Sequence, residues 1–71
     1  MLKPEIGSLW TLDMGDHTYT GMVTGYEAHD CVRLLVLTSD RASAIGDTYT
    51  SYLHAFSLEK EEDRDVWLPL V

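Results

Sequence analysis

The longest uninterrupted apolar run of the chain, Leu34–Leu37, lies near its middle, inside the segment 32–38. Polar residues that favour turns flank this segment, His29–Asp30 before it and Ser39–Asp40 after it. Seven residues rich in branched side chains and bounded in this way are typical of a strand buried on both faces. A helix of that length would not be stable by itself. We therefore predict a central β-strand over 32–38.

Two segments before the central strand also have strand patterns. Small polar residues alternate with large apolar ones over 8–12, and 18–27 is rich in Thr, Tyr and Val. Gly21 and Gly25 interrupt the second segment, and glycine inside a strand often marks a bulge or a sharp bend. With both glycines on the same face, we expect this strand to coil strongly enough to curl the sheet.

The pattern changes after the central strand. Small and polar residues over 39–46 predict a loop, with Ile45 turned inward. The segment 47–53 consists mostly of hydroxyl-bearing and aromatic residues, which favour a strand. The segment 54–58 is predicted to form one short helical turn.

The last two segments of the sequence differ in character: the first is charged and the second is mostly apolar. The charged run 59–65 predicts a solvated turn, and 66–71 predicts a final strand. Pro69 has no backbone N–H, so this strand belongs at an edge of the sheet. Five short strands with one helical turn predict an all-β fold in a single domain over 1–71. The expected architecture is a small antiparallel five-stranded barrel or a highly curved sheet.

Charge and cysteine content narrow the functional classes. Five Lys and Arg stand against twelve Asp and Glu, which gives a formal net charge of −7. Nucleic-acid affinity comes mainly from clustered cations, so we expect no direct binding to DNA or RNA and a basic partner surface instead. Cys31 is the only cysteine, and no segment approaches the ~20 apolar residues that span a bilayer. We therefore expect a cytoplasmic protein without membrane contact.

The order of these features resembles the small SH3-like barrels found among short proteins of bacteriophages and mobile elements. The resemblance covers nearly the whole chain as a pattern. Its parts are the opening Lys3–Trp10, the paired segments between Gly21 and Thr38, Gly46–Tyr49, the turn Leu53–Phe56 and the strand opened by Trp67. The resemblance implies a small binder, and some proteins of this type block host defence by capturing a protein or a signalling nucleotide.

The residues that carry metal or catalytic chemistry do not form a recognisable site. A zinc site needs four ligands, usually as spaced pairs, and the chain offers one H-x-C pair, His29 with Cys31. No serine lies in a G-x-S-x-G elbow, and no glycine-rich phosphate loop is present. We therefore expect no metal, no cofactor and no enzymatic activity.

Charged and aromatic residues are the candidates for binding. Arg33 and Arg41 are suited to an anionic ligand because a guanidinium grips phosphate in two places. Tyr49 and Tyr52 have opposite parity on one strand, so at least one is expected to be exposed, whereas Trp10 and Phe56 are expected in the core. Acidic residues suited to a basic partner surface are Glu59, Glu61, Glu62, Asp63 and Asp65.

These observations predict a non-enzymatic binding module, which we interpret as a phage anti-defence inhibitor. It would either insert its acidic run into a basic groove of a host protein, as a nucleic-acid mimic, or sequester a signalling nucleotide. The alternative is a structural or assembly protein that acts by self-association as a homo-oligomer, since an edge strand is a ready surface for pairing.

Overall fold

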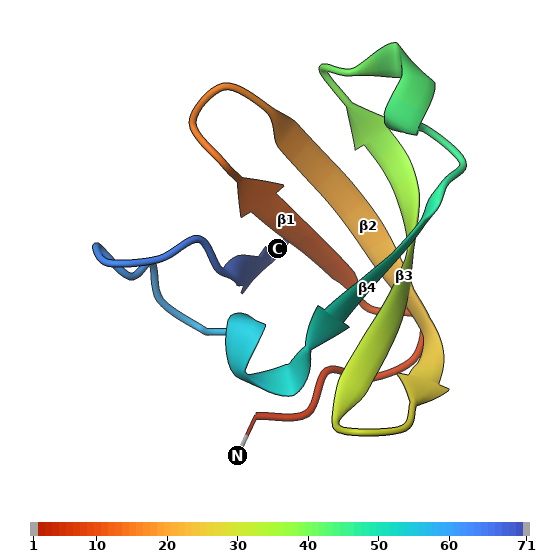
Figure 1. Cartoon of the computed structure of the whole chain (residues 1–71), viewed down its shortest axis with the longest axis vertical. Helices are drawn as coiled ribbons and strands as arrows, with labels where there is room; N and C mark the ends of the chain where they lie inside the picture. Colours follow the sequence, from red (N-terminus) through yellow and green to blue (C-terminus); the bar gives the residue numbers. More distant parts are fainter. Residues whose placement is uncertain (1, 71) are drawn as a thin grey trace.

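A computed structural model describes residues 2–70 of the chain; Met1 and Val71 lie outside the described residues. The described strands are β1 (Leu9–Asp13), β2 (Thr18–Glu27), β3 (Cys31–Ser39), β4 (Thr48–Tyr52) and β5 (Trp67–Pro69). They form one antiparallel sheet with the order β4-β3-β2-β1-β5, and its curvature can be followed in Figure 1. Two short 3-10 turns, η1 (Ala42–Ala44) and η2 (Leu53–Ala55), complete the described chain.

The all-β prediction is confirmed, including the short helical turn near 54–58, which lies at Leu53–Ala55. Over residues 2–70 the strands form a curved sheet that is not closed into a barrel. The final strand is shorter than the predicted 66–71 because only Trp67–Pro69 pairs with β1, at the sheet edge expected for a strand with proline. The end of that predicted segment, Val71, is outside the described residues.

The curvature comes from two irregularities in the pairing of β2 with β3. The register shifts between Thr20 and Gly21 and again between Val23 and Gly25, which confirms that the glycines mark bulges. The prediction that both glycines share one face is wrong. A side chain at Gly21 would meet Leu34 in the core, whereas one at Gly25 would meet the Arg33 guanidinium on the opposite face. The second bulge lies between the glycines, and an extra residue in a strand reverses which face later residues occupy.

The concave inner side of the sheet holds the core. Trp67 is 1% exposed, and its ring packs against Phe56 at 6.1 Å and against Tyr49 at 5.7 Å, measured between ring centroids. Trp10 meets Phe56 edge to face at 5.1 Å, so the core predicted around these two residues is confirmed. The remaining buried hydrophobic residues of this cluster are Leu12, Tyr19, Val23, Val32, Leu34 and Val36.

The central strand is buried on one face, not on both as predicted. Val32, Leu34 and Val36 face the core, while Leu35 is half-buried and Leu37 is 38% exposed on the other side. An apolar run alone does not distinguish a doubly covered strand from one whose outer face carries apolar residues. Ile45, predicted to turn inward, is 50% exposed because η1 carries it away from the core.

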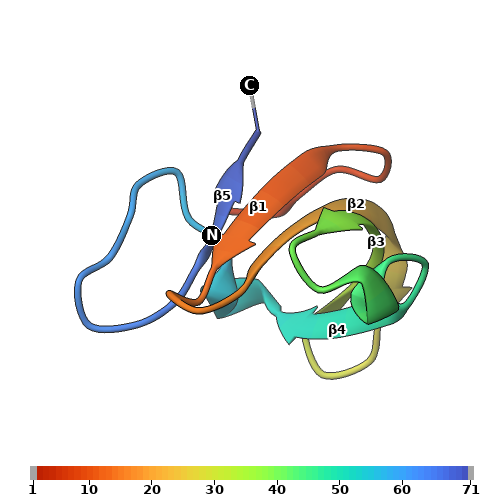
Figure 2. The same cartoon turned by 90° about the horizontal axis from the view of Figure 1, so that it is seen from above.

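The segment 57–66, here named the acidic loop, leaves the sheet and returns to it at a single place. Phe56 forms a parallel bridge with Trp67, and the Ser57 amide donates to the Trp67 carbonyl at 2.9 Å. Figure 2 shows this loop standing out beside β5, away from β2, β3 and β4. Its base is therefore fixed to the core aromatics while its length lies outside the sheet.

Candidate acidic groove

A groove of about 570 Å³ lies between the acidic loop and the end of β1. β1 supplies its floor from outward-facing positions, because Trp10 and Leu12 point into the core and Thr11 and Asp13 point away from it. The residues that line it are Thr11, Asp13, Met14, Gly15, Lys60, Glu61, Glu62, Asp63, Arg64, Asp65, Val66 and Leu68. Five carboxylates and two cations thus surround one depression.

The loop is held at its two ends by different contacts. At the first end the Ser57 hydroxyl donates to the Glu59 carbonyl at 2.6 Å and accepts from the Glu59 amide at 3.1 Å. At the other end Val66 is 5% exposed, so an apolar side chain anchors the return to β5. The charged residues between these anchors face solvent on a segment without regular secondary structure.

Inside the loop, Glu61 and Arg64 form an ion pair with two hydrogen bonds. Arg64 Nε donates to Glu61 Oε1 at 2.8 Å and Nη2 donates to Oε2 at 3.1 Å. The hydrogen bond from Arg64 lowers the pKa of Glu61 below its ordinary value, and the same bond raises the pKa of Arg64. This pair closes the loop on itself.

Arg64 also links the loop to η2. Its Nη1 lies 3.1 Å from His54 Nδ1, and a guanidinium has only donors, so the imidazole nitrogen is the acceptor. The His54 ring in turn stacks on Tyr52, with 5.4 Å between centroids and 7° between planes.

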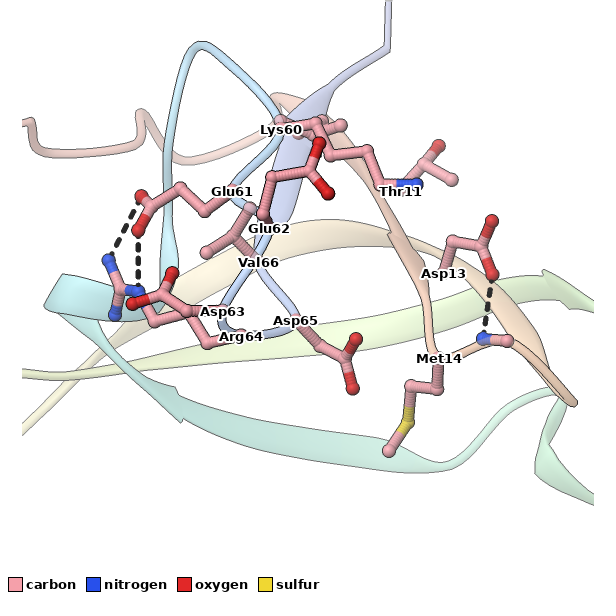
Figure 3. A pocket seen from close by; sticks show the side chains of 12 residues that line it. Thr11, Asp13, Met14, Lys60, Glu61, Glu62, Asp63, Arg64, Asp65 and Val66 are labelled. Atoms are coloured by element: carbon pink, nitrogen blue, oxygen red, sulfur yellow. Dashed lines mark hydrogen bonds and ion pairs between the residues drawn. The ribbon is translucent and has the colours of Figure 1, made fainter.

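The other carboxylates of the groove are available to a partner. Figure 3 shows Glu62 and Asp65 pointing from the loop toward β1, whereas Glu61 points the other way, to Arg64. Asp13 completes this set from β1, where its Oδ1 accepts the Gly15 amide at 2.9 Å. Among residues 2–70, these three carboxylates take part in no ion pair. The groove therefore presents three carboxylates that form no ion pair, beside Lys60, which lines the same groove.

The acidic run predicted from the sequence is largely brought together here. Glu61, Glu62, Asp63 and Asp65 line the groove, while Glu59 lies beside it in the loop. Sequence reasoning missed Asp13 and Met14 on the opposite wall. Their position where a strand ends in a turn was visible in the sequence, but the placement of this turn across the groove from the acidic loop was not.

The basic and aromatic candidates lie elsewhere. Arg33 lies on the outer face of β3, where Nε donates to Thr24 Oγ1 at 3.3 Å and Nη1 meets Glu27 Oε1 at 3.4 Å. Arg41 follows the far end of β3 and lines a smaller hollow of about 200 Å³ together with Tyr49. The structure places the two arginines at opposite ends of the strand.

The two candidate tyrosines of β4 face opposite ways, as their parity predicts. Tyr49 packs against the core cluster, and Tyr52 is 57% exposed. The sequence-based expectation that at least one of them is exposed is confirmed.

The described residues contain neither a metal-binding cluster nor a helix that could span a membrane. Among residues 2–70, no group of three or more His, Cys, Asp or Glu side chains is arranged to hold a metal ion. The same residues include no helix of the length and apolar character needed to cross a bilayer.

Comparison with known proteins adds no relative: no family model, curated protein or solved structure matches this chain.

Proposed function

We propose that the protein is a non-enzymatic binding module that captures a basic surface of a partner protein in its acidic groove. One observation carries this proposal: Asp13, Glu62 and Asp65 face one depression of about 570 Å³ and form no ion pair among residues 2–70. Carboxylates arranged in this way attract Lys and Arg side chains and raise the rate of encounter with a basic partner.

The biological role that we propose follows from the resemblance to small phage proteins. A basic groove that normally holds a nucleic-acid backbone would accept the carboxylates in place of phosphates. The partner would then be a nucleic-acid-binding component of host defence, and the protein would act as its inhibitor in the host cytosol. The net charge of −7 supports a protein partner over direct contact with DNA or RNA.

The test measures binding of a fluorescent oligolysine peptide to the intact protein. Two triple variants are compared with the wild type. The first, Asp13→Asn with Glu62→Gln and Asp65→Asn, removes the three groove charges. The second, Glu5→Gln with Asp30→Asn and Asp47→Asn, removes three charges that do not line the groove. Both variants have the same net charge, so total charge cannot explain a difference between them.

We expect the groove variant to bind the peptide about tenfold more weakly and the control variant to bind nearly as the wild type does. Wild-type affinity should also fall steeply between about 0.1 M salt, where the screening length is about 10 Å, and about 1 M, where it is about 3 Å. Equal losses in both variants, or affinity independent of salt, would contradict the proposal.

A second candidate function, sequestration of an anionic nucleotide, is favoured by the hollow that Arg41 shares with Tyr49. An arginine beside an aromatic ring suits a phosphate and a base. The measurement is the melting temperature with and without a panel of cyclic nucleotides. A rise that disappears in Arg41→Gln would support this function, and an unchanged melting temperature would remove it.

A further inference from the structure

A row of apolar side chains crosses the outer face of the sheet. In the register of the strands, Leu9 of β1 lies opposite Met22 of β2, and Met22 lies opposite Leu35 of β3. The Leu70 amide donates to the Leu9 carbonyl at 3.0 Å, which extends the row to the segment after β5. Because directly paired residues project to the same side, these four residues form one stripe, which we name the outer row.

The outer row is open to solvent. Leu9 is 38% and Leu70 is 49% exposed, while Met22 and Leu35 are half-buried. On one side of the row, the neighbouring line of paired residues consists of Thr11, Thr20 and Thr38. On the other side, Arg33, paired with Glu27, lies two residues from Leu35 on the outer face of β3. Contiguous apolar residues on an exposed face with a polar margin are typical of an interaction surface.

The outer row is continuous with the acidic groove. Leu68 pairs with Thr11, and both line the groove, each two residues from the row, from Leu70 and Leu9 respectively. Val66, just before β5, and Leu68 line the groove, and Leu70, just after β5, lies at the end of the row. The combined surface therefore has apolar side chains along the outer row and acidic side chains at the end that meets the groove.

From this surface we infer that the partner contributes a basic amphipathic segment, with apolar side chains on the outer row and cations in the acidic groove. This inference rests on the proposed function and adds an apolar part to the binding surface. Charge complementarity selects the occupant: a second copy of this chain would bring another seven net negative charges to a face that ends in carboxylates. A segment with Lys or Arg beside Leu or Ile satisfies both parts of the surface.

The test uses two synthetic peptides of identical leucine and lysine content. In the first, the leucines lie on one face of a helix; in the second, the same residues are scrambled so that no apolar face forms. Binding of both to the wild-type protein is measured by calorimetry. We expect the patterned peptide to bind about tenfold more tightly, because only this peptide covers the outer row while its lysines reach the groove.

Variants locate the effect on the protein. Leu9→Thr with Leu35→Thr keeps residues that favour strands and removes apolar area from the outer row. Ile45→Thr removes a similarly exposed side chain from the loop after η1 and serves as the control. We expect the double variant to lose the preference for the patterned peptide, and the control to keep it. Amide chemical shifts of the wild type should change along the outer row with the patterned peptide.

The outcomes separate this inference from the proposed function. Equal binding of both peptides, with the groove charges still required, would overturn the apolar part and leave the acidic groove in place. No binding of either peptide would overturn both. A wild-type dimer in sedimentation that Leu9→Thr with Leu35→Thr converts to a monomer would make a second copy the occupant and overturn the inference.

Discussion

The inner side of the sheet and the acidic loop are held in place by different forces. On the inner side, buried aromatic and branched residues pack around Trp67, and their positions follow from the alternation of side chains along strands. The acidic loop is held by the Glu61–Arg64 ion pair, by the hydrogen bond from Ser57 to Glu59 and by the buried side chain of Val66. The first region determines stability, and the second presents charge.

The difference shows how a small chain separates folding from binding. The loop begins and ends next to the Phe56–Trp67 bridge, so the core fixes its base without using its charged residues. Carboxylates can therefore gather on the loop at little cost to the fold. Substitutions in the two regions should have different effects, and the following predictions test that separation.

The largest effect is expected from Trp67→Ala. Trp67 is 1% exposed and contacts both Phe56 and Tyr49, so its removal leaves a large cavity. We expect a loss of about 3–5 kcal/mol in the free energy of unfolding, measured by urea denaturation. Leu58→Ala, at a residue 69% exposed within the acidic loop, should change it by less than about 0.5 kcal/mol. Comparable losses of unfolding free energy in the two variants would contradict the separation between a stabilising core and a charged loop.

A smaller loss is expected from Ser51→Ala. The Ser51 hydroxyl accepts the indole N–H of Trp67 at 2.9 Å, and its removal leaves a buried donor without this partner. We expect a loss of about 1–3 kcal/mol, with Ser43→Ala in η1 as the exposed control. If Ser51→Ala is as stable as the wild type, this hydrogen bond does not help to hold the core.

A gain is expected from Asp30→Gly in the hairpin between β2 and β3. His29 and Asp30 have φ angles of 63° and 57°, a region that glycine adopts without the steric penalty of a side chain. We expect an increase of up to about 1 kcal/mol in the free energy of unfolding. Asp30→Asn removes the same charge and tolerates this conformation, so it is the control for electrostatic effects. A stability equal to that of the control would show that no strain was relieved.

The smallest effect is a local dependence on pH in the acidic loop. The pKa of Glu61 is lower in the folded protein than its ordinary value of 4.5, because Arg64 donates hydrogen bonds to the carboxylate. The stabilisation is therefore complete above the ordinary value and is lost as pH falls through the lowered pKa. The ¹⁵N signal of Arg64 Nε should shift below about pH 4.5 while core signals stay in place. In Glu61→Gln this transition should be absent; its persistence would assign it to another group.

The sequence predicted the inner side of the molecule well for a physical reason. Alternation with period two over 8–12 predicted a half-buried strand, and Trp10 and Phe56 were predicted in the core. It predicted the outer face poorly, because Leu35 and Leu37 were counted as core. The hydrophobicity of a side chain indicates its preference for burial. It does not indicate whether the chain has enough residues to cover both faces of the sheet.

The groove could be predicted only in part. The acidic run was evident from composition, but the groove also needs the turn after β1, which lies more than forty residues away in the sequence. The placement of this turn across the groove from the acidic loop depends on the pairing of β5 with β1, through Leu12 opposite Trp67. Long-range register of this kind is set by the packed core and has no local signature.

The most direct test of the account is an NMR titration of the ¹⁵N-labelled protein with oligolysine. If the packed sheet supports a separate charged binding region, amide signals of the acidic loop and of the turn at 13–15 will shift together. The indole N–H of Trp67 and the core amides of Val23 and Leu34 will stay in place. Shifts centred on Arg33 or Arg41, or no shifts at saturating peptide, would contradict the claim that the acidic groove is the binding site.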